Sequence, residues 1–146
     1  MNLKELIRKL PKEIVYKIRF LAYKTQDRML LRDIKLYYTS NMFLRNLYYM
    51  RIIVRENMPE PEDKNWLIND IYAFLNNGQA LMHGYIDDFY KVMMRRKRLK
   101  TKKQVIRFIE KLDNKPVSNQ INFFLSIMNN YERIQLINYC LHLENS

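Results

Sequence analysis

Apolar side chains recur along this chain at the three- and four-residue spacing that places them on one face of an α-helix. Segments 68–75 and 105–112 show this spacing most clearly, with apolar residues at their first, fourth, fifth and eighth positions. Only two glycines and four prolines interrupt 146 residues, which favours helices joined by short turns over a many-turned sheet. The pattern predicts an all-α fold, a compact multi-helix array of about eight short helices.

The clearest interruption of this pattern is the segment 57–64. Its two prolines, Pro59 and Pro61, are separated by an acidic residue and cannot lie inside a helix. The length of the chain is that of one compact domain. We therefore expect a single helical domain over residues 1–146, with a hinge at 57–64 between an N-terminal and a C-terminal half.

Short polar motifs predict where individual helices begin and end. Asn76-Asn77-Gly78 is typical of a helix C-terminus, because Asn and Gly accept the left-handed conformation that closes a helix. Thr101 and Gln104 have the spacing of a capping box, which predicts a helix start. Thr39-Ser40-Asn41 are also capping residue types, and we expect a new helix to begin after them.

Composition limits the class of protein. The chain is 48% hydrophobic and 28% charged, which is enough for a packed core and unlike a disordered tail. Cys140 is the only cysteine, so an internal disulfide is impossible and a reducing, intracellular compartment is expected. No apolar run approaches the roughly 18 residues of a membrane-spanning helix.

The formal net charge of +11 is unevenly distributed along the chain. Residues 1–56 carry 13 Lys and Arg against 5 Asp and Glu, residues 57–90 carry 1 against 6, and residues 91–107 carry 9 against none. Two basic blocks are thus separated by an acidic one. This asymmetry predicts anionic partners or neighbours of complementary charge.

The second basic block supplies the candidate residues for binding an anionic partner. These are Lys91, Arg95, Arg96, Lys97, Arg98, Lys100, Lys102, Lys103 and Arg107. Because Thr101 predicts a helix start inside the block, we expect a turn that splays the charges rather than one helical stripe. The block has no interleaved aromatic residues, so any nucleic acid would be bound through phosphates and without regard to sequence. An acidic protein surface is the alternative partner.

Tyrosine is abundant, and four of the eleven tyrosines form the adjacent pairs Tyr37-Tyr38 and Tyr48-Tyr49. Tyrosine suits protein interfaces because it offers a large contact area with a polar tip. We predict these four residues as candidate protein-interface positions. Packing in the core is the alternative for each of them.

Motifs for enzymatic chemistry are absent from the sequence. There is no glycine-rich phosphate loop, no serine elbow and no paired His and Cys spacing for a metal. Cys140 and His142 are two positions apart and Asp87 and Asp88 are adjacent, so within a helix neither pair shares a face. We therefore predict a non-enzymatic protein without a metal site, a cofactor or a small-molecule substrate.

Residues 10–40 resemble a known motif. Leu10-Pro11 opens a helical pattern that continues through Ile14 and Ile18, and this start resembles an F-box. The following segments are similar to an F-box-like variant in uncharacterised proteins of large nucleocytoplasmic DNA viruses, the giant viruses. They read Tyr23-Lys24-Thr25-Gln26 and Leu30-Leu31-Arg32-Asp33-Ile34. The resemblance implies which residues would dock on the adaptor of a ubiquitin ligase if this segment is a working F-box. They are Leu10, Pro11, Ile14 and Ile18.

Three functional hypotheses follow. The first is a structural or assembly protein of a large DNA virus, a minor capsid or internal virion component that binds other protein chains in the virion and the host cytoplasm. The second is a nucleic-acid-binding protein that uses the basic residues of 91–107 without sequence preference. The third, which rests on the resemblance alone, is an F-box-like ubiquitin-ligase adaptor.

Overall fold

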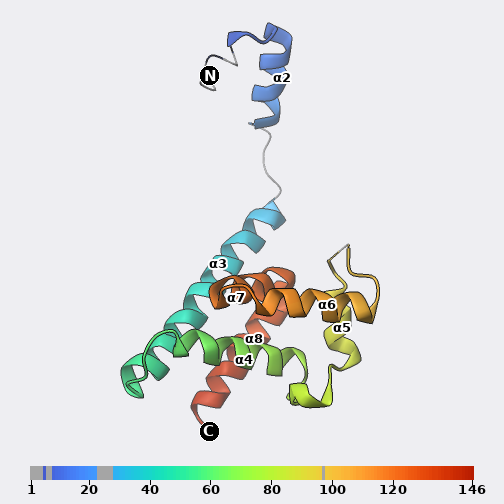
Figure 1. The fold of residues 1–146 in the computed structure, drawn as a ribbon. Helices are drawn as coiled ribbons and strands as arrows, with labels where there is room; N and C mark the ends of the chain where they lie inside the picture. Colours follow the sequence, from blue (N-terminus) through green and yellow to red (C-terminus); the bar gives the residue numbers. More distant parts are fainter. Residues whose placement is uncertain (1–4, 6–7, 23–27, 97) are drawn as a thin grey trace. The chain divides into compact units, whose positions relative to one another are not determined.

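The chain is helical in this computed structural model, which describes residues 5, 8–22, 28–96 and 98–146, without the side chains of 18–22 (Figure 1). Its α-helices are α2 (Lys12–Ala22), α3 (Arg28–Tyr48), α4 (Glu62–Leu75), α5 (Asp87–Met93), α6 (Lys102–Asp113), α7 (Val117–Ile127) and α8 (Asn130–Glu144). A π-helix, η1 (Tyr49–Arg55), continues α3, and a short 3-10 helix, η2 (Leu81–His83), precedes α5. The described part of the chain is 76% helical and contains no strand, which confirms the predicted all-α array.

The chain forms two compact units, residues 1–32 and residues 33–146. The first contains α2 and the opening turn of α3, and the second contains the rest of α3 and every later element. The segment 57–64, which the sequence suggested as a hinge, lies within the second unit. Residues 57–61 lie between η1 and α4, and residues 62–64 begin α4. The two helices η1 and α4 pack against one another.

Helix α3 passes without a break through Thr39, Ser40 and Asn41, so the predicted start of a new helix after these residues is wrong. The Thr39 hydroxyl donates a hydrogen bond to the carbonyl of Lys35 within the same helix, at 2.9 Å. Ser40 and Asn41 are buried, and Asn41 bonds to Asn122 of α7. The side chains of Thr39 and Asn41, which could otherwise favour a helix end, are thus satisfied within α3 and by α7 respectively.

The junction of α3 and η1 is fixed to α4 by a partly buried polar group. Tyr48 and Arg51 both contact the carboxylate of Asp70, through a short hydrogen bond and a 3.6 Å ion pair respectively. The Arg51 guanidinium also lies 4.5 Å from the centre of the Tyr48 ring. Burial raises the pKa of the Tyr48 hydroxyl well above its ordinary value, so Tyr48 is a neutral hydrogen-bond donor.

Three helix boundaries follow polar motifs. Helix α4 ends at Leu75, and Asn77 and Gly78 both take positive φ angles, as predicted from Asn76-Asn77-Gly78. The predicted capping box of Thr101 is present at the start of α6, with both reciprocal hydrogen bonds to Gln104. A second capping box, between Asn129 and Glu132, begins α8.

The core of the second unit lies where α7 packs on α4. Phe124 of α7 is fully buried, and its ring meets that of Tyr72 edge-on at 4.8 Å between centroids. Phe89 of α5 is also fully buried, and its ring stacks on that of Tyr72 at 6.2 Å between centroids. Aromatic packing therefore joins α4, α5 and α7 into one core.

Candidate functional site

One face of α3 is fixed to α7 by a polar network. Asn41 donates to the side-chain oxygen of Asn122 at 2.8 Å, and Arg45 donates to the same oxygen at 2.9 Å. Arg45 also donates to the hydroxyl and the carbonyl of Ser118 at 3.2 and 3.1 Å. Ser118, in the first turn of α7, is thus a partner of α3.

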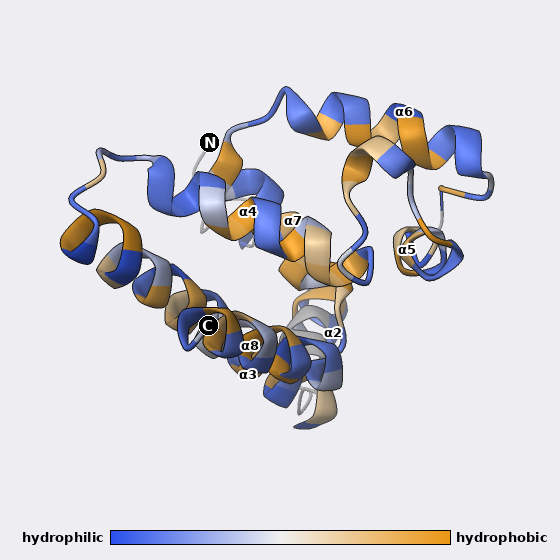
Figure 2. Ribbon diagram, turned by 90° about the horizontal axis from the view of Figure 1, so that it is seen from below, coloured by the Kyte–Doolittle hydropathy of each residue, from blue (hydrophilic) through white to orange (hydrophobic). Residues whose placement is uncertain are grey.

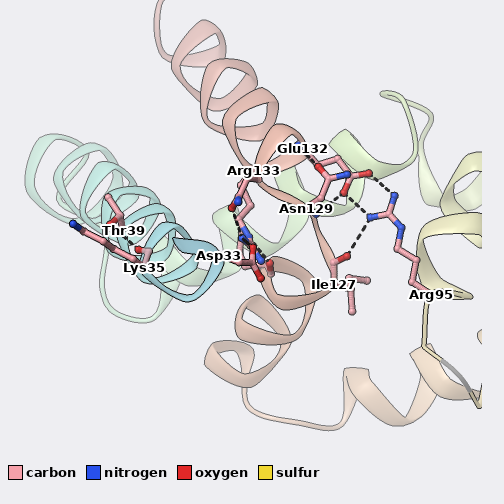
Figure 3. A network of polar contacts seen from close by, with 10 residues as sticks. Asp33, Lys35, Thr39, Arg95, Ile127, Asn129, Glu132 and Arg133 are labelled. Carbon is pink, nitrogen blue, oxygen red and sulfur yellow. Dashed lines mark hydrogen bonds and ion pairs between the residues drawn. The ribbon is translucent and has the colours of Figure 1, made fainter. Parts of the chain in front are cut away.

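A second attachment joins α3 to α8 (Figure 3). Arg133 is buried, with 2% of its side chain exposed, and donates to Asp33 and Asn130, both at 2.7 Å, and to the Leu125 carbonyl at 2.9 Å. Its guanidinium lies 5.5 Å from the ring centre of Tyr37. The orientation of this part of α3 is therefore fixed by specific hydrogen bonds.

Another face of α3 exposes apolar side chains to solvent. Ile34, Tyr38 and Met42 are 43%, 62% and 72% exposed, and we call them the α3 stripe. Their four-residue spacing places them in a row on one side of the helix. Figure 2 shows hydrophobic residues along α3 as well as along α4, α6 and α7. The α3 stripe is thus a regularly spaced apolar surface on this unit.

The four predicted interface tyrosines have different environments. Tyr38 and Tyr49 are exposed, in agreement with a surface position, and Tyr37 is half-buried against the core. Tyr48 is fully buried, so its prediction as an interface residue is wrong. In each adjacent pair only the second residue is exposed, because neighbouring helical positions are about 100° apart around the axis.

The F-box-like candidates lie in the first unit. Leu10 and Ile14 are 39% and 41% exposed, and Pro11 is exposed at the start of α2. The side chain of Ile18 lies outside the described residues, as does the whole segment Tyr23–Gln26. The three described residues are accessible to a partner, and their role stays a prediction.

The basic candidates surround a turn, as predicted. Helix α5 ends at Met93 and α6 begins at Lys102, so the charges do not form one helical stripe. Lys91 pairs with Asp88 at 3.3 Å, and Lys102 pairs with Asp87 at 2.8 Å. Lys102 also lies 5.0 Å from the ring centre of Tyr90. The acidic pair therefore neutralises part of the basic block.

Arg95 forms an ion pair with Glu132 at the start of α8 (Figure 3). Its two terminal nitrogens donate to the two carboxylate oxygens of Glu132 at 2.6 and 2.5 Å, and one of them also donates to the Ile127 carbonyl at 3.1 Å. The hydrogen bonds from Arg95 hold the pKa of Glu132 below its ordinary value. Arg95 thus fastens the α5–α6 connection to the start of α8.

We expect Glu132→Gln to lower the free energy of unfolding by about 1 kcal/mol, because it removes a half-exposed ion pair but keeps a side chain that can complete the capping box. Glu132→Ala should cost about 1 kcal/mol more, through loss of the cap. Since the folded state has the lower pKa, the contribution of Glu132 is present above the ordinary value of 4.5 and is lost as the pH falls below it. Urea unfolding of the unmodified protein and both variants, at pH 7 and pH 3, measures the cost of each substitution and its dependence on pH. Equal stability of Glu132→Gln and the unmodified protein at pH 7 would show that the ion pair of Glu132 with Arg95 does not stabilise the fold.

The remaining described basic candidates form no ion pair with a carboxylate of the described residues. Among the described residues, no ion pair involves the exposed side chains of Arg98, Lys100, Lys103 or Arg107. Arg96 stacks on an aromatic ring instead of pairing with an acid. Lys97 lies outside the described residues. The structure therefore divides the candidate cluster into cations that hold the fold and cations that are available to a ligand.

The groups considered for chemistry do not converge. Cys140 is fully buried beside Tyr48, and burial raises the pKa of its thiol to about 11. Within the described part of the chain, no three His, Cys, Asp or Glu side chains are grouped so that they could hold a metal ion. Nor does any described helix have the length and apolar character needed to cross a membrane.

Ile34 and Met42 were not among the sequence candidates, although their spacing with Tyr38 was visible. The spacing marks one face of a helix but does not say whether that face is covered. The candidates for the site are thus the α3 stripe and the unpaired cations of the basic block. Comparisons with protein-family models, with curated proteins and with solved structures give no match for this chain.

Proposed function

We propose that this chain is a non-enzymatic assembly protein that binds another protein chain through the α3 stripe. The observation that supports it is the exposure of Ile34, Tyr38 and Met42 on a helix whose other side is fixed by hydrogen bonds. On the resemblance of residues 10–40, the assembly is the particle of a large DNA virus, in which the chain is a minor capsid or internal component.

The energetics favour burial of this surface in a complex. Single exposed apolar residues are common in soluble proteins, but a row of three on one helix face offers a continuous contact. Burying a large apolar side chain contributes about 1.5–3 kcal/mol. Three such residues can therefore drive association. Because α3 is already held in place, little conformational entropy is lost when a partner binds.

The partner we propose is a different chain with an apolar contact surface and an acidic rim. Lys35, next to the stripe in sequence, is exposed, and the whole chain carries a net charge of +11. A second copy would bring like charges together, whereas an acidic neighbour is attracted. Charge complementarity therefore favours a different chain over self-association.

Met42→Glu tests this proposal, because a carboxylate in an apolar contact loses its hydration without gaining a partner. We expect the variant to fold normally and to be incorporated into assembled particles at least about 10-fold less than the unmodified protein. Met82→Glu is the matched control, since Met82 is also highly exposed, at 86%, but lies in η2. Normal incorporation of Met42→Glu would contradict the proposal.

The identity of the partner is tested by a photo-crosslinking amino acid at position 38. We expect one dominant product within purified particles, in which position 38 is joined to an acidic protein of the particle. A product that joins two copies of this chain would overturn the proposed partner. The same crosslinker in place of Met82 provides the background.

A further inference from the structure

A pocket of about 310 Å³ lies between α6, α7 and the segment that precedes α6. It is lined by Arg96, Phe108, Lys111, Leu112, Lys115 and Phe123. Three of these residues are cations and three are apolar. The pocket therefore combines positive charge with an aromatic and aliphatic wall, and its lining residues come from positions 96 to 123 of the sequence.

Aromatic rings support the cation on one side of the pocket. The Arg96 guanidinium lies 4.6 Å from the ring centre of Phe108 and 5.7 Å from that of Phe123. The two rings are themselves in contact, with centroids 5.0 Å apart. A guanidinium that rests on a ring by its face keeps its N–H donors, which lie in its plane, available for a phosphate.

Two further lining residues, Leu112 and Lys115, are also held by the fold. Leu112 is buried, and Gln120, itself only 7% exposed, donates a hydrogen bond to the Lys115 carbonyl at 2.9 Å. This bond fixes the backbone that carries Lys115, immediately before α7 begins. Lys111 and Lys115 are exposed, so their ammonium groups are accessible to a ligand.

A row of cations leads away from the pocket along α6. Lys103, Arg107 and Lys111 follow one another at four-residue intervals, which places them on one helix face about 6 Å apart along the axis. All three are exposed, and among the described residues none is paired with a carboxylate. A line of evenly spaced positive charges suits a ligand that repeats its negative charge.

We propose that this surface binds single-stranded nucleic acid. The phosphates lie along Lys103, Arg107 and Lys111 and end at Arg96 and Lys115, while one base enters the pocket against Phe123. The row of cations alone would also suit the carboxylates of an acidic peptide. The half-buried rings, however, offer a stacking partner that a base uses and a carboxylate does not. A single strand is favoured over a duplex, because only an unpaired base can leave its stack to enter a pocket. This inference is independent of the α3 stripe.

The charge contribution is tested with fluorescent oligo(dT) and oligo(U), whose binding to the full chain is followed by anisotropy over a range of salt concentrations. With about 0.7 counterions released per phosphate contact on a single strand, five contacts give a slope of about −3.5 in log affinity against log salt. Lys111→Gln with Lys115→Gln should flatten this slope by about 1.4. Lys35→Gln with Lys64→Gln, which removes the same charge from α3 and α4, should leave most of the slope intact. Equal flattening by both pairs would show non-specific attraction and overturn the site.

The stacking contribution is tested with Phe123→Leu, which keeps an apolar side chain but removes the ring. We expect roughly 10-fold weaker binding of the single strand with an unchanged salt slope, since stacking on an aromatic ring carries no counterion release. Circular dichroism and thermal unfolding verify the fold of this variant. The two-lysine variant tests the site even if Phe123→Leu fails to fold, because both lysines are exposed.

The competing ligands are measured in the same assay. The proposal requires oligo(dT) or oligo(U) to bind more tightly than a duplex or poly-glutamate of equal length. Comparison of oligo(dU) with oligo(U) identifies the sugar that the site accepts, because these two strands differ only at the 2′ position. Binding of poly-glutamate or of the duplex that equals or exceeds that of the single strands would overturn the proposal.

Discussion

Replacing Phe124 by alanine is expected to lower the free energy of unfolding of the second unit by about 3–5 kcal/mol. Phe124 is fully buried, and its ring contacts both Tyr72 of α4 and Phe123 of α7. The substitution removes this apolar area and leaves a cavity at the contact between α4 and α7. Because domains are stable by only about 5–15 kcal/mol, this is a large fraction of the total.

Denaturant unfolding followed by circular dichroism measures the effect. Phe124→Leu should cost less than Phe124→Ala, because it fills part of the cavity. Tyr131→Ala is the control for truncation of an aromatic residue, since Tyr131 is 70% exposed on α8 and should change stability by no more than about 0.5 kcal/mol. Similar losses for Phe124→Ala and Tyr131→Ala would show that the core does not lie between α4 and α7.

Replacing Asp33 by asparagine is expected to cost about 3 kcal/mol, although it changes only one charge on a half-exposed side chain. Asp33 is 47% exposed, whereas its partner Arg133 is 2% exposed and cannot regain its hydration in the folded protein. The variant leaves the buried guanidinium without its counter-charge. The bonds to the Leu125 carbonyl and to Asn130 remain and limit the loss.

Replacement of the partner residue, Arg133→Met, should lower the free energy of unfolding by less than Asp33→Asn does. It removes the buried charge together with its desolvation, fills much of the same volume, and returns Asp33 to water. The double variant should therefore resemble Arg133→Met alone, and a double-mutant cycle gives the coupling. If Arg133→Met proved the more damaging substitution, the guanidinium would contribute chiefly through its hydrogen bonds to α7 and α8.

These two contacts also determine how the proposed surfaces are presented. Arg133 and Asp33 hold the part of α3 that carries Ile34, and the packing of Phe124 positions the helix from which Phe123 contributes to the pocket. Loss of binding in a variant is therefore interpretable only when its fold is unchanged. Exposed positions such as Met42, Lys111 and Lys115 meet this condition.

The sequence by itself determined the features that depend on local interactions. Helical spacing of apolar residues was sufficient for the all-α fold, since burial of one face stabilises each helix. The capping box of Thr101 and the stop at Asn76-Asn77-Gly78 were also predicted, because their hydrogen bonds and φ angles involve residues a few positions apart. The turn inside the basic block followed from the same capping box.

Only the tertiary structure decided which partner each side chain meets. Thr39-Ser40-Asn41 lie within α3, where Asn41 bonds to Asn122 of α7, and a local motif cannot reveal such a distant partner. Tyr48 is in the core and Tyr38 is exposed, although both belong to similar pairs of tyrosines. Spacing identifies a helix face, but the packing of other helices decides whether that face is covered.

The basic block shows most clearly that the sequence does not reveal which partner a side chain meets. Its nine cations carry the same charge in the sequence, yet Arg95 is taken up by Glu132, 37 residues away, while Lys103 and Arg107 have no carboxylate partner among the described residues. The aromatic rings that the block lacks are supplied by α6 and α7, where Phe108 and Phe123 support Arg96. Charge and composition are properties of the chain, whereas contacts between distant residues exist only once the helices have packed.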